Sequence, residues 1–397
     1  MATTMRFGAN YTPRRGWFHS QAHLDLSHTR EDLAHIASLG LDHVRIFPLW
    51  PHLQPSRGLI DSHAVDTVLN IVDAAGEAGL DVSVDVLNGH LSSFDFLPSW
   101  VTTWHQRNIF TDPEVIAAEQ ELTRTLGVQL EERPHCTGLT LGNEIGQFAA
   151  PRHPSQQVTS VEEAGAWTRS LLETATEAFP RGRHTHCFDD DLWFVDAQPF
   201  TPEHAVTLGA ETTVHSWVFG GAGQRYGIDN PALAFFARYL IEIADMWHRA
   251  LEVSPERGIW LQEIGAPTPW VTPEAAPDFA VNSVRAAISH PKVTTVTWWC
   301  SHDVSRDLPD YPEVEYTLGL IDTHGQTKPI GQALSELIAE VKRYGVPAQS
   351  SVDPLDAPDL ALDGSDRSRT NTRSDLFDTW IQEAREGRLR PLNLPGK

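Results

Sequence analysis

Hydrophobic residues in the first 345 positions gather into short runs, and longer stretches with helical spacing separate these runs. Short apolar runs bounded by turn residues are typical of buried strands, whereas apolar positions that recur every three or four residues are typical of helices. The runs that we predict to be strands are residues 6–10, 43–47, 82–87, 138–141, 184–188, 212–215, 259–262 and 293–298. Eight such alternations predict an α/β fold, a (β/α)8 TIM barrel with long loops after its strands.

The main alternative is a doubly wound open sheet, whose first strand is normally followed by the pattern Gly-x-Gly-x-x-Gly. Here the first strand continues as Phe7-Gly-Ala-Asn-Tyr11 instead. The longest loops also follow strands, as the active-site face of a barrel requires. These loops are residues 48–61, 88–111, 218–230 and 300–328.

Local residues predict where several helices begin and end. Proline directly after a capping side chain suits the first helical position, as at Asp112-Pro113, Asn230-Pro231 and Thr272-Pro273. Ser160 and Glu163 have the spacing of a capping box. A last barrel helix is expected over residues 329–344, with Gly345 as its stop.

Beyond Gly345 the pattern changes, so we divide the chain into a barrel, residues 1–345, and a C-terminal extension, residues 346–397. Residues 346–373 are rich in Pro, Asp, Ser and Thr and are typical of a linker or a surface wrapping. Residues 374–386 have the apolar spacing of one short amphipathic helix. We expect this helix to dock on the barrel or on a partner subunit, which would allow a homo-oligomer.

The chain carries 53 acidic and 30 basic residues, for a formal charge of −23. This charge argues against nucleic acid or an anionic membrane surface as a partner. No apolar run is long enough to span a membrane, and the first residues lack the apolar segment of a secretory signal. Cys136, Cys187 and Cys300 are odd in number and far apart, which indicates reduced core thiols. Together these features predict a cytoplasmic protein.

Two glutamates follow strands that lie on opposite sides of the predicted barrel. The apolar run 136–141 ends at a glycine that is followed by Asn143 and Glu144, and the run 259–262 is followed by Glu263. Because all strands of such a barrel end at one face, both carboxyl groups should lie over one pocket. Two carboxylates that flank a glycosidic bond are the basic equipment of glycoside hydrolysis, and a separation of about 5–5.5 Å gives retention of configuration.

The tryptophans support a sugar-sized ligand. Aromatic rings at a pocket offer flat apolar faces on which a sugar ring stacks. Five of them lie in or beside the predicted loops: Trp50, Trp100, Trp104, Trp217 and Trp299. Any one of them could instead be a bulky core residue.

These motifs resemble the retaining glycoside hydrolases of clan A, and family 5 in particular, over residues 6–345. The resemblance rests on Asn143-Glu144 and on Glu263. Four further positions fit the family: Arg45 at the end of the second strand, His90 after the third, His215-Ser-Trp217 after the sixth and Trp298-Trp299 at the end of the eighth. Trp217 departs from the pattern, since the family usually has tyrosine there.

The resemblance implies that Glu144 is the acid/base and Glu263 the nucleophile. It also implies that Asn143 binds the sugar 2-hydroxyl and that Arg45 keeps Glu263 ionised. The wider set expected to bind substrate is His90, His215, Trp217, Trp299, Trp50 and Asn10. No cofactor and no metal is expected, because retaining hydrolysis needs none.

Residues 7–17 and 89–98 resemble an actinobacterial group, subfamily 18. That group is associated with exo-acting β-mannosidases that cut mannose β-1,4-linked to N-acetylglucosamine, so the expected partner is a β-mannoside or small oligosaccharide. An endo-β-1,4-mannanase or β-glucanase of the same family is the alternative. A non-catalytic carbohydrate-binding barrel would keep the tryptophans but need not keep both glutamates.

His184 and His186, followed by three aspartates at 189–191, invite a metal-site interpretation. We prefer the interpretation that the two histidines line the fifth strand and are hydrogen-bonded to their neighbours.

Overall fold

Eight parallel strands form the centre of the computed structural model, which describes residues 5–105, 107–346 and 352–396. Each strand pairs in parallel with its neighbours in the order β7-β6-β3-β2-β1-β10-β9-β8, and β1 pairs with β10 to bring the two ends of the barrel sequence together. The strands are β1 Arg6–Asn10, β2 His43–Ile46, β3 Asp81–Val86, β6 Cys136–Leu141, β7 Thr185–His186, β8 Thr212–Ser216, β9 Ile259–Ile264 and β10 Val293–Trp298. The predicted (β/α)8 barrel is confirmed.

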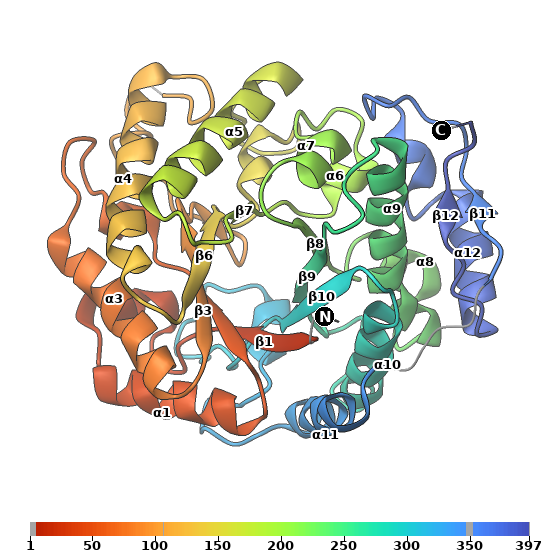
Figure 1. Cartoon of the computed structure of the whole chain (residues 1–397). Helices are drawn as coiled ribbons and strands as arrows, with labels where there is room; N and C mark the ends of the chain where they lie inside the picture. Colours follow the sequence, from red (N-terminus) through yellow and green to blue (C-terminus); the bar gives the residue numbers. More distant parts are fainter. Residues whose placement is uncertain (1–4, 106, 347–351, 397) are drawn as a thin grey trace.

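A ring of helices surrounds the strands (Figure 1). The ring consists of α1 Leu26–Ser38, α3 Ser62–Glu77, α4 Pro113–Glu131, α5 Val161–Ala178, α7 Pro202–Thr207, α9 Phe236–Ala250, α10 Ala276–Ile288 and α11 Pro329–Tyr344. Their apolar faces pack on the outer side chains of the strands in one continuous hydrophobic core. This arrangement leaves the ends of the strands as the place where polar side chains can meet.

The predicted helix starts are confirmed except for one. Asp112 caps α4, Ser160 and Glu163 form the capping box of α5, and Asn230 caps the 3-10 helix η3 Pro231–Phe235 that leads into α9. The start at Thr272-Pro273 was wrong, because α10 begins only at Ala276. The backbone N–H and hydroxyl of Thr272 both donate to Asp229, which holds this segment in a turn before the helix.

Short elements cover the mouth of the barrel, where the strands end. They are η1 Trp17–His23, α2 Trp50–Leu53, the hairpin of β4 His90–Leu91 with β5 Phe94–Asp95, η2 Ile145–Ala149, α6 Asp191–Phe194, α8 Gly221–Tyr226 and η4 Glu313–Thr317. Aromatic residues of η1, the hairpin and the loop after β10 form a second, smaller hydrophobic cluster. These elements are the long strand-to-helix loops that the sequence predicted.

The C-terminal extension lies against the outside of the barrel at α9 (Figure 1). It contains β11 Leu355–Asp356 paired with β12 Leu392–Asn393, the 3-10 helix η5 Arg367–Thr370 and α12 Asp375–Arg385. The predicted helix is therefore confirmed, and its buried residues Phe377 and Trp380 contact the ring of Tyr239 in α9. Residues 347–351 of the predicted linker lie outside the described residues.

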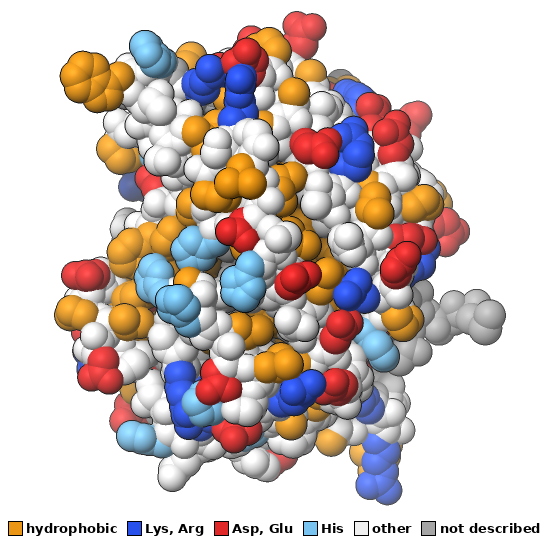
Figure 2. All heavy atoms as spheres, turned by 90° about the vertical axis from the view of Figure 1, so that its left-hand side faces the viewer, with side chains coloured by type: hydrophobic (Ala, Val, Ile, Leu, Met, Phe, Trp, Pro, Cys, Tyr) orange, Lys and Arg blue, Asp and Glu red, His pale blue; other side chains and the backbone are white. Residues whose placement is uncertain are grey.

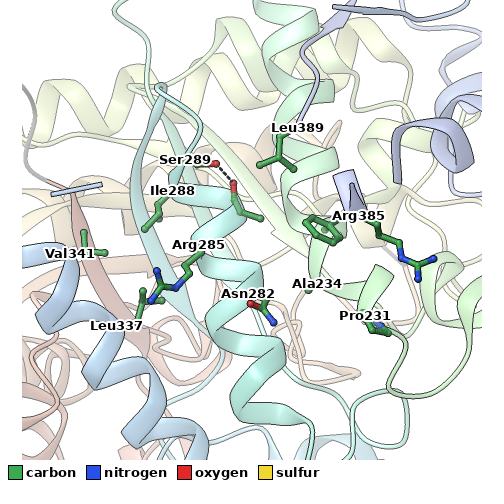
Figure 3. Close-up of a pocket in the computed structure, with 12 residues that line it drawn as sticks. Pro231, Ala234, Asn282, Arg285, Ile288, Ser289, Leu337, Val341, Arg385 and Leu389 are labelled. Atoms are coloured by element: carbon green, nitrogen blue, oxygen red, sulfur yellow. Dashed lines mark hydrogen bonds between the residues drawn. The ribbon is translucent and has the colours of Figure 1, made fainter. Parts of the chain in front are cut away.

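Acidic side chains are scattered over the face drawn in Figure 2 and are interleaved with basic ones. None of the described helices is long and apolar enough to cross a membrane. A groove of about 630 Å³ lies in the helical layer between α10, α11 and the C-terminal extension (Figure 3). Its lining is mainly apolar, and none of the predicted site residues contributes to it.

Candidate active site

The two glutamates predicted to act together lie over one pocket at the mouth of the barrel. An oxygen of Glu144, an oxygen of Glu263 and a ring nitrogen of His215 all lie within 4.8 Å of one another. Glu144 leaves β6 in the left-handed conformation, at φ 45°, directly after Gly142 and Asn143. Such a conformation is costly for a residue with a side chain and occurs mainly where function requires it. The spacing of the oxygens fits the short separation of a retaining pair and not the wider one of an inverting pair.

Arg45 is the centre of a buried network beneath the glutamates. From β2, its guanidinium donates to Glu263 Oε1 at 2.8 Å and to Asn143 Oδ1 at 2.7 Å. Its other edge donates to both carboxylate oxygens of Asp85 in β3, at 2.8 and 2.6 Å. Arg45 and Asp85 are fully buried, so this bidentate pair fixes the arginine fork rigidly. Burial raises the pKa of Asp85 to about 6, against the opposing effect of Arg45.

Trp217 takes over the position where the family usually has tyrosine. Its indole Nε1 donates to Glu263 Oε2 at 3.3 Å, so each oxygen of this carboxylate receives one hydrogen bond from a fixed donor. The indole fits because residue 265 is glycine, where a Cβ would lie 2.8 Å from the Trp217 ring. The substitution therefore preserves a donor to the nucleophile candidate, by a different side chain.

His215 lies between the two glutamates and is completely buried. Its Nδ1 is 2.7 Å from Glu144 Oε1 and 3.3 Å from Glu263 Oε2, and its Nε2 is 3.2 Å from Gln262 Oε1. Burial lowers the pKa of His215, so the ring is neutral near neutral pH. Because the side-chain amide oxygen of Gln262 can only accept, the neutral ring donates to it from Nε2 and has a bare Nδ1, which accepts a hydrogen bond from a protonated partner.

The pocket above this network has a volume of about 380 Å³. Among the residues that line it, the sequence predicted His90, Asn143, Glu144, Trp217, Glu263 and Trp299. The predicted residues Asn10, Arg45 and His215 lie just beneath the pocket, each without exposed surface, and therefore act through the side chains above them. Asn10 donates to the backbone oxygens of Gln262 and Trp298, which ties β1 to β9 and β10.

Trp50 is the predicted substrate-binding residue that the structure contradicts. Its side chain is 0% exposed, its Nε1 donates to Gln54 Oε1 at 2.9 Å, and its ring packs edge-on against Trp100. Trp50 does not line the pocket. It is a core residue because α2 turns back into the barrel wall directly after β2.

Several residues of the pocket were not predicted. They are Ser92, Ser93, Asp95, Gln147, Arg152, His153, Pro154, Asp189, Asp190, Phe219 and Glu315. Asp189 and Asp190 belong to the acidic run 189–191, which we considered from the sequence only as part of a metal site. The others come from loops whose paths depend on tertiary contacts. Ser92, Ser93 and Asp95 belong to the stretch 89–98, which we noted in the sequence for its resemblance to subfamily 18, but no side chain in it other than His90 was predicted to reach the pocket.

The two histidines of the metal-site interpretation are engaged by the backbone. His184 Nδ1 accepts from the Leu139 N–H, and its Nε2 lies 2.8 Å from the Phe179 carbonyl oxygen. His186 Nε2 lies 3.1 Å from the Ala205 carbonyl oxygen, and burial lowers its pKa to about 3. Both rings thus serve the packing around β7, as we preferred.

Solved structures identify the family of this chain, whereas no family model and no curated protein sequence matched it. The subfamily 18 protein of glycoside hydrolase family 5 from Streptomyces cattleya, in complex with GlcNAc, is 45% identical at a TM-score of 0.94, covering 100% of this chain and 94% of that chain. A Glu→Ala variant of the Streptomyces cattleya protein, in complex with Manβ1-4GlcNAc, is 44% identical at a TM-score of 0.93, covering 99% of this chain and 94% of that chain.

The corresponding protein of Bifidobacterium longum subsp. longum is 41% identical at a TM-score of 0.93, with 98% of this chain and 92% of that chain covered. This chain belongs to subfamily 18 of glycoside hydrolase family 5. The subfamily 18 membership makes it a glycoside hydrolase, which removes the non-catalytic sugar-binding barrel from consideration. The predicted resemblance to family 5, and to subfamily 18 within it, is confirmed.

Proposed function

We propose that this glycoside hydrolase is a retaining exo-β-mannosidase that cleaves mannose β-1,4-linked to N-acetylglucosamine. The observation that carries the proposal is the pair Glu144 and Glu263, with oxygens within 4.8 Å over a pocket large enough for a small oligosaccharide. The subfamily 18 relatives that hold Manβ1-4GlcNAc support the choice of substrate.

In the first step, Glu263 attacks the anomeric carbon while Glu144 donates its proton to the glycosidic oxygen. The bond to the leaving sugar breaks, and an ester between mannose and Glu263 forms. In the second step, Glu144 removes a proton from water, which attacks the same carbon and releases Glu263. Two inversions give retention of configuration.

The contacts of the two glutamates give them different roles. Glu263 accepts hydrogen bonds from the Arg45 guanidinium and the Trp217 indole, and both favour its ionised form. Glu144 faces the bare Nδ1 of His215, which favours a protonated carboxyl group. Burial raises the pKa of Glu144 further. The pair therefore holds one proton near neutral pH, with Glu144 as its carrier.

Asn143 is suited to bind the 2-hydroxyl of the reacting sugar. Its Oδ1 accepts from Arg45 Nη2, and one N–H of its amide donates to the His90 carbonyl oxygen at 3.2 Å. This fixes the orientation of the amide and leaves its second N–H for the substrate. A hydrogen bond to the 2-hydroxyl that strengthens in the transition state lowers the barrier for both steps.

The proposal is tested with 4-nitrophenyl β-mannoside and Manβ1-4GlcNAc as substrates for the wild type and for Glu263→Ala and Glu144→Ala. On Manβ1-4GlcNAc, both variants should lose at least about 10³-fold in kcat. On the aryl mannoside, Glu144→Ala should lose less, because the nitrophenolate leaving group needs little protonation. Added azide should give α-mannosyl azide with Glu263→Ala and β-mannosyl azide with Glu144→Ala. Faster hydrolysis of 4-nitrophenyl β-glucoside, or of internal bonds in β-mannan, than of these two mannosides would overturn the assignment as an exo-β-mannosidase.

Two further proposals concern the setting of the enzyme. Cys136, Cys187 and Cys300 are free and buried, which supports a reducing, cytoplasmic location. A homo-oligomer through the C-terminal extension would have to use the outer, polar face of α12, because its apolar face packs on its own barrel. Size-exclusion chromatography with light scattering tests this.

A further inference from the structure

A contact across the mouth of the barrel closes one side of the active-site pocket. Ser92, at the tip of the hairpin β4–β5 after β3, donates from its hydroxyl to Glu315 Oε2 at 3.0 Å. Glu315 lies in η4, in the loop after β10. In the order of strands around the barrel, β3 and β10 are separated by β2 and β1, so this hydrogen bond spans two intervening strands.

The hairpin tip is held firmly in this position. Ser92 and Ser93 have φ angles of 51° and 68°, a conformation that costs energy for any residue with a side chain and persists only where the surroundings impose it. Behind the tip, the ring of Phe94 packs against Tyr311 at 4.9 Å, and Trp17 packs against both. The hairpin and the loop after β10 therefore form one rigid wall.

The carboxylate of Glu315 has acceptor sites that the contacts within this wall do not fill. It lines the pocket beside Trp299 and accepts a hydrogen bond from Ser92. Burial raises its pKa to about 7. A carboxylate has about four acceptor sites, so the hydrogen bond from Ser92 leaves room for further donors. No basic side chain is paired with Glu315 among the ion pairs of the described residues.

The position of Glu315 relative to Glu144 indicates which part of a bound substrate Glu315 can contact. Glu144 follows β6, and the pocket residues Gln147, Arg152 and Asp189 come from the loops after β6 and β7, on the same side of the barrel mouth. The acid must lie beside the leaving group, so this is the side of the N-acetylglucosamine. In an eight-stranded barrel β10 stands opposite β6. Glu315 therefore lines the pocket on the side of Trp299, across from Glu144.

We propose that Glu315 is a specificity-determining residue, which accepts hydrogen bonds from the 3- and 4-hydroxyls of the terminal mannose and limits the enzyme to chain ends. This inference rests on the function proposed above. The two hydroxyls are neighbours on the ring edge opposite the leaving group, and a carboxylate can accept from both at once. An extra sugar at the 4-hydroxyl would meet the wall held together by Ser92 and Glu315.

The test compares Glu315→Ala and Glu315→Gln with Glu313→Gln, a control on the same helix whose exposed side chain pairs with Arg306. Each protein is assayed with 4-nitrophenyl β-mannoside and with its 3-deoxy and 4-deoxy derivatives. Removing a recognised hydroxyl should lower kcat/KM of the wild type and of Glu313→Gln about 10-fold to 100-fold. Glu315→Ala should already have a low kcat/KM on the intact mannoside. Removal of the same hydroxyl should lower the kcat/KM of this variant by less than about 3-fold further. Glu315→Gln should be intermediate, because its amide oxygen can still accept.

Equal losses on the deoxy sugars in the wild type and in Glu315→Ala would overturn the inference. Thermal unfolding of each variant separates loss of the fold from loss of recognition. Binding of Manβ1-4GlcNAc and its deoxy derivatives to Glu144→Gln, with and without Glu315→Ala, gives the same comparison without turnover. If the wild type hydrolysed no mannoside, the proposed function would fail, whereas this binding comparison would still decide whether Glu315 recognises the terminal sugar.

Discussion

His215 Nδ1 lies 2.7 Å from Glu144 Oε1, while the opposite nitrogen of the same ring lies 3.2 Å from Gln262 Oε1. The strand residue Gln262 thus sets the tautomer of a histidine that in turn sets where the proton of the active site resides. Each of these three side chains comes from a different strand end.

Replacing His215 by alanine should lower kcat for Manβ1-4GlcNAc about 10-fold to 100-fold. Because Nδ1 stabilises the protonated form of Glu144, its loss should lower the pKa of that carboxyl group and move the alkaline limb of the pH profile towards lower pH. His135→Ala, at a half-exposed histidine paired with Asp81, is the control and should leave the profile unchanged. An unshifted alkaline limb in His215→Ala would contradict this role.

The pH dependence of kcat/KM should be bell-shaped. Burial raises the pKa of both Glu144 and Glu263, and mutual repulsion prevents both from being ionised together easily. Activity should fall at low pH, where the nucleophile gains a proton, and at high pH, where the acid loses its proton. Both limbs should lie above the ordinary range of a glutamate. The profile of Glu144→Gln, which cannot lose a proton at residue 144, should lack the alkaline limb.

Chelation should leave activity intact. Glu144, His215 and Glu263 have ligand atoms close enough to hold a metal ion, but the Arg45 guanidinium at 2.8 Å from Glu263 already supplies the positive charge there. Prolonged dialysis against EDTA should therefore change kcat/KM by less than about 2-fold. Loss of activity that Zn²⁺ or Mg²⁺ restores would show that a cation is required.

Glu119 offers a test of stability that is independent of catalysis. This residue of α4 is fully buried, accepts from Trp167 Nε1 at 2.8 Å, and has its pKa raised well above the usual value by burial. A carboxyl group whose pKa is raised on folding stabilises the protein below its unfolded pKa, and this contribution is lost as the pH rises through the folded pKa. Glu119→Gln should therefore raise Tm at pH 8 but not at pH 4, whereas the exposed Glu121→Gln should change Tm at neither pH.

The C-terminal extension should be an integral part of the folded enzyme. Trp380 is completely buried, contacts Tyr239 of α9 and donates from Nε1 to the Arg390 carbonyl oxygen at 2.7 Å. Trp380→Ala should cost about 3–5 kcal/mol in the free energy of unfolding. Thermal unfolding with two probes, tryptophan fluorescence and circular dichroism, should give one shared transition at a lower Tm. An unchanged Tm would mean that the extension folds separately, with Asp375→Ala on the exposed face as the control.

The barrel strands could be predicted from the sequence because most of their positions are buried, and several of them contain apolar runs, as Ile259–Ile264 does. The least accurate prediction of strand bounds was that of β7, which is Thr185–His186 in the structure against the predicted 184–188, because the chain turns towards the pocket directly after it. Glu144, Glu263, Asn143 and Arg45 could be located because they sit at strand ends, whose positions the fold dictates. The burial of Trp50 could not be predicted from the sequence, because the loop that carries it folds back into the core.

The unpredicted part of the site comes from loops. Ser92 and Glu315 meet across the barrel mouth although they are 223 positions apart in sequence. Nothing in either local sequence indicates the other, since no periodicity extends through an irregular loop. The same holds for Arg152 and Asp189, which reach the pocket from consecutive but independent loops. Such juxtapositions depend on the packing of whole segments against one another.

The pairing of β1 with β10 has a consequence for how the protein is made. Arg6 lies opposite Thr295, so the first strand of the barrel keeps one edge unsatisfied until nearly three hundred further residues have been synthesised. The residues that complete the packing of α9, among them Trp380, emerge later still. Folding to the active form must therefore wait for nearly the whole chain, and nascent chains should depend on protection of that open edge during translation.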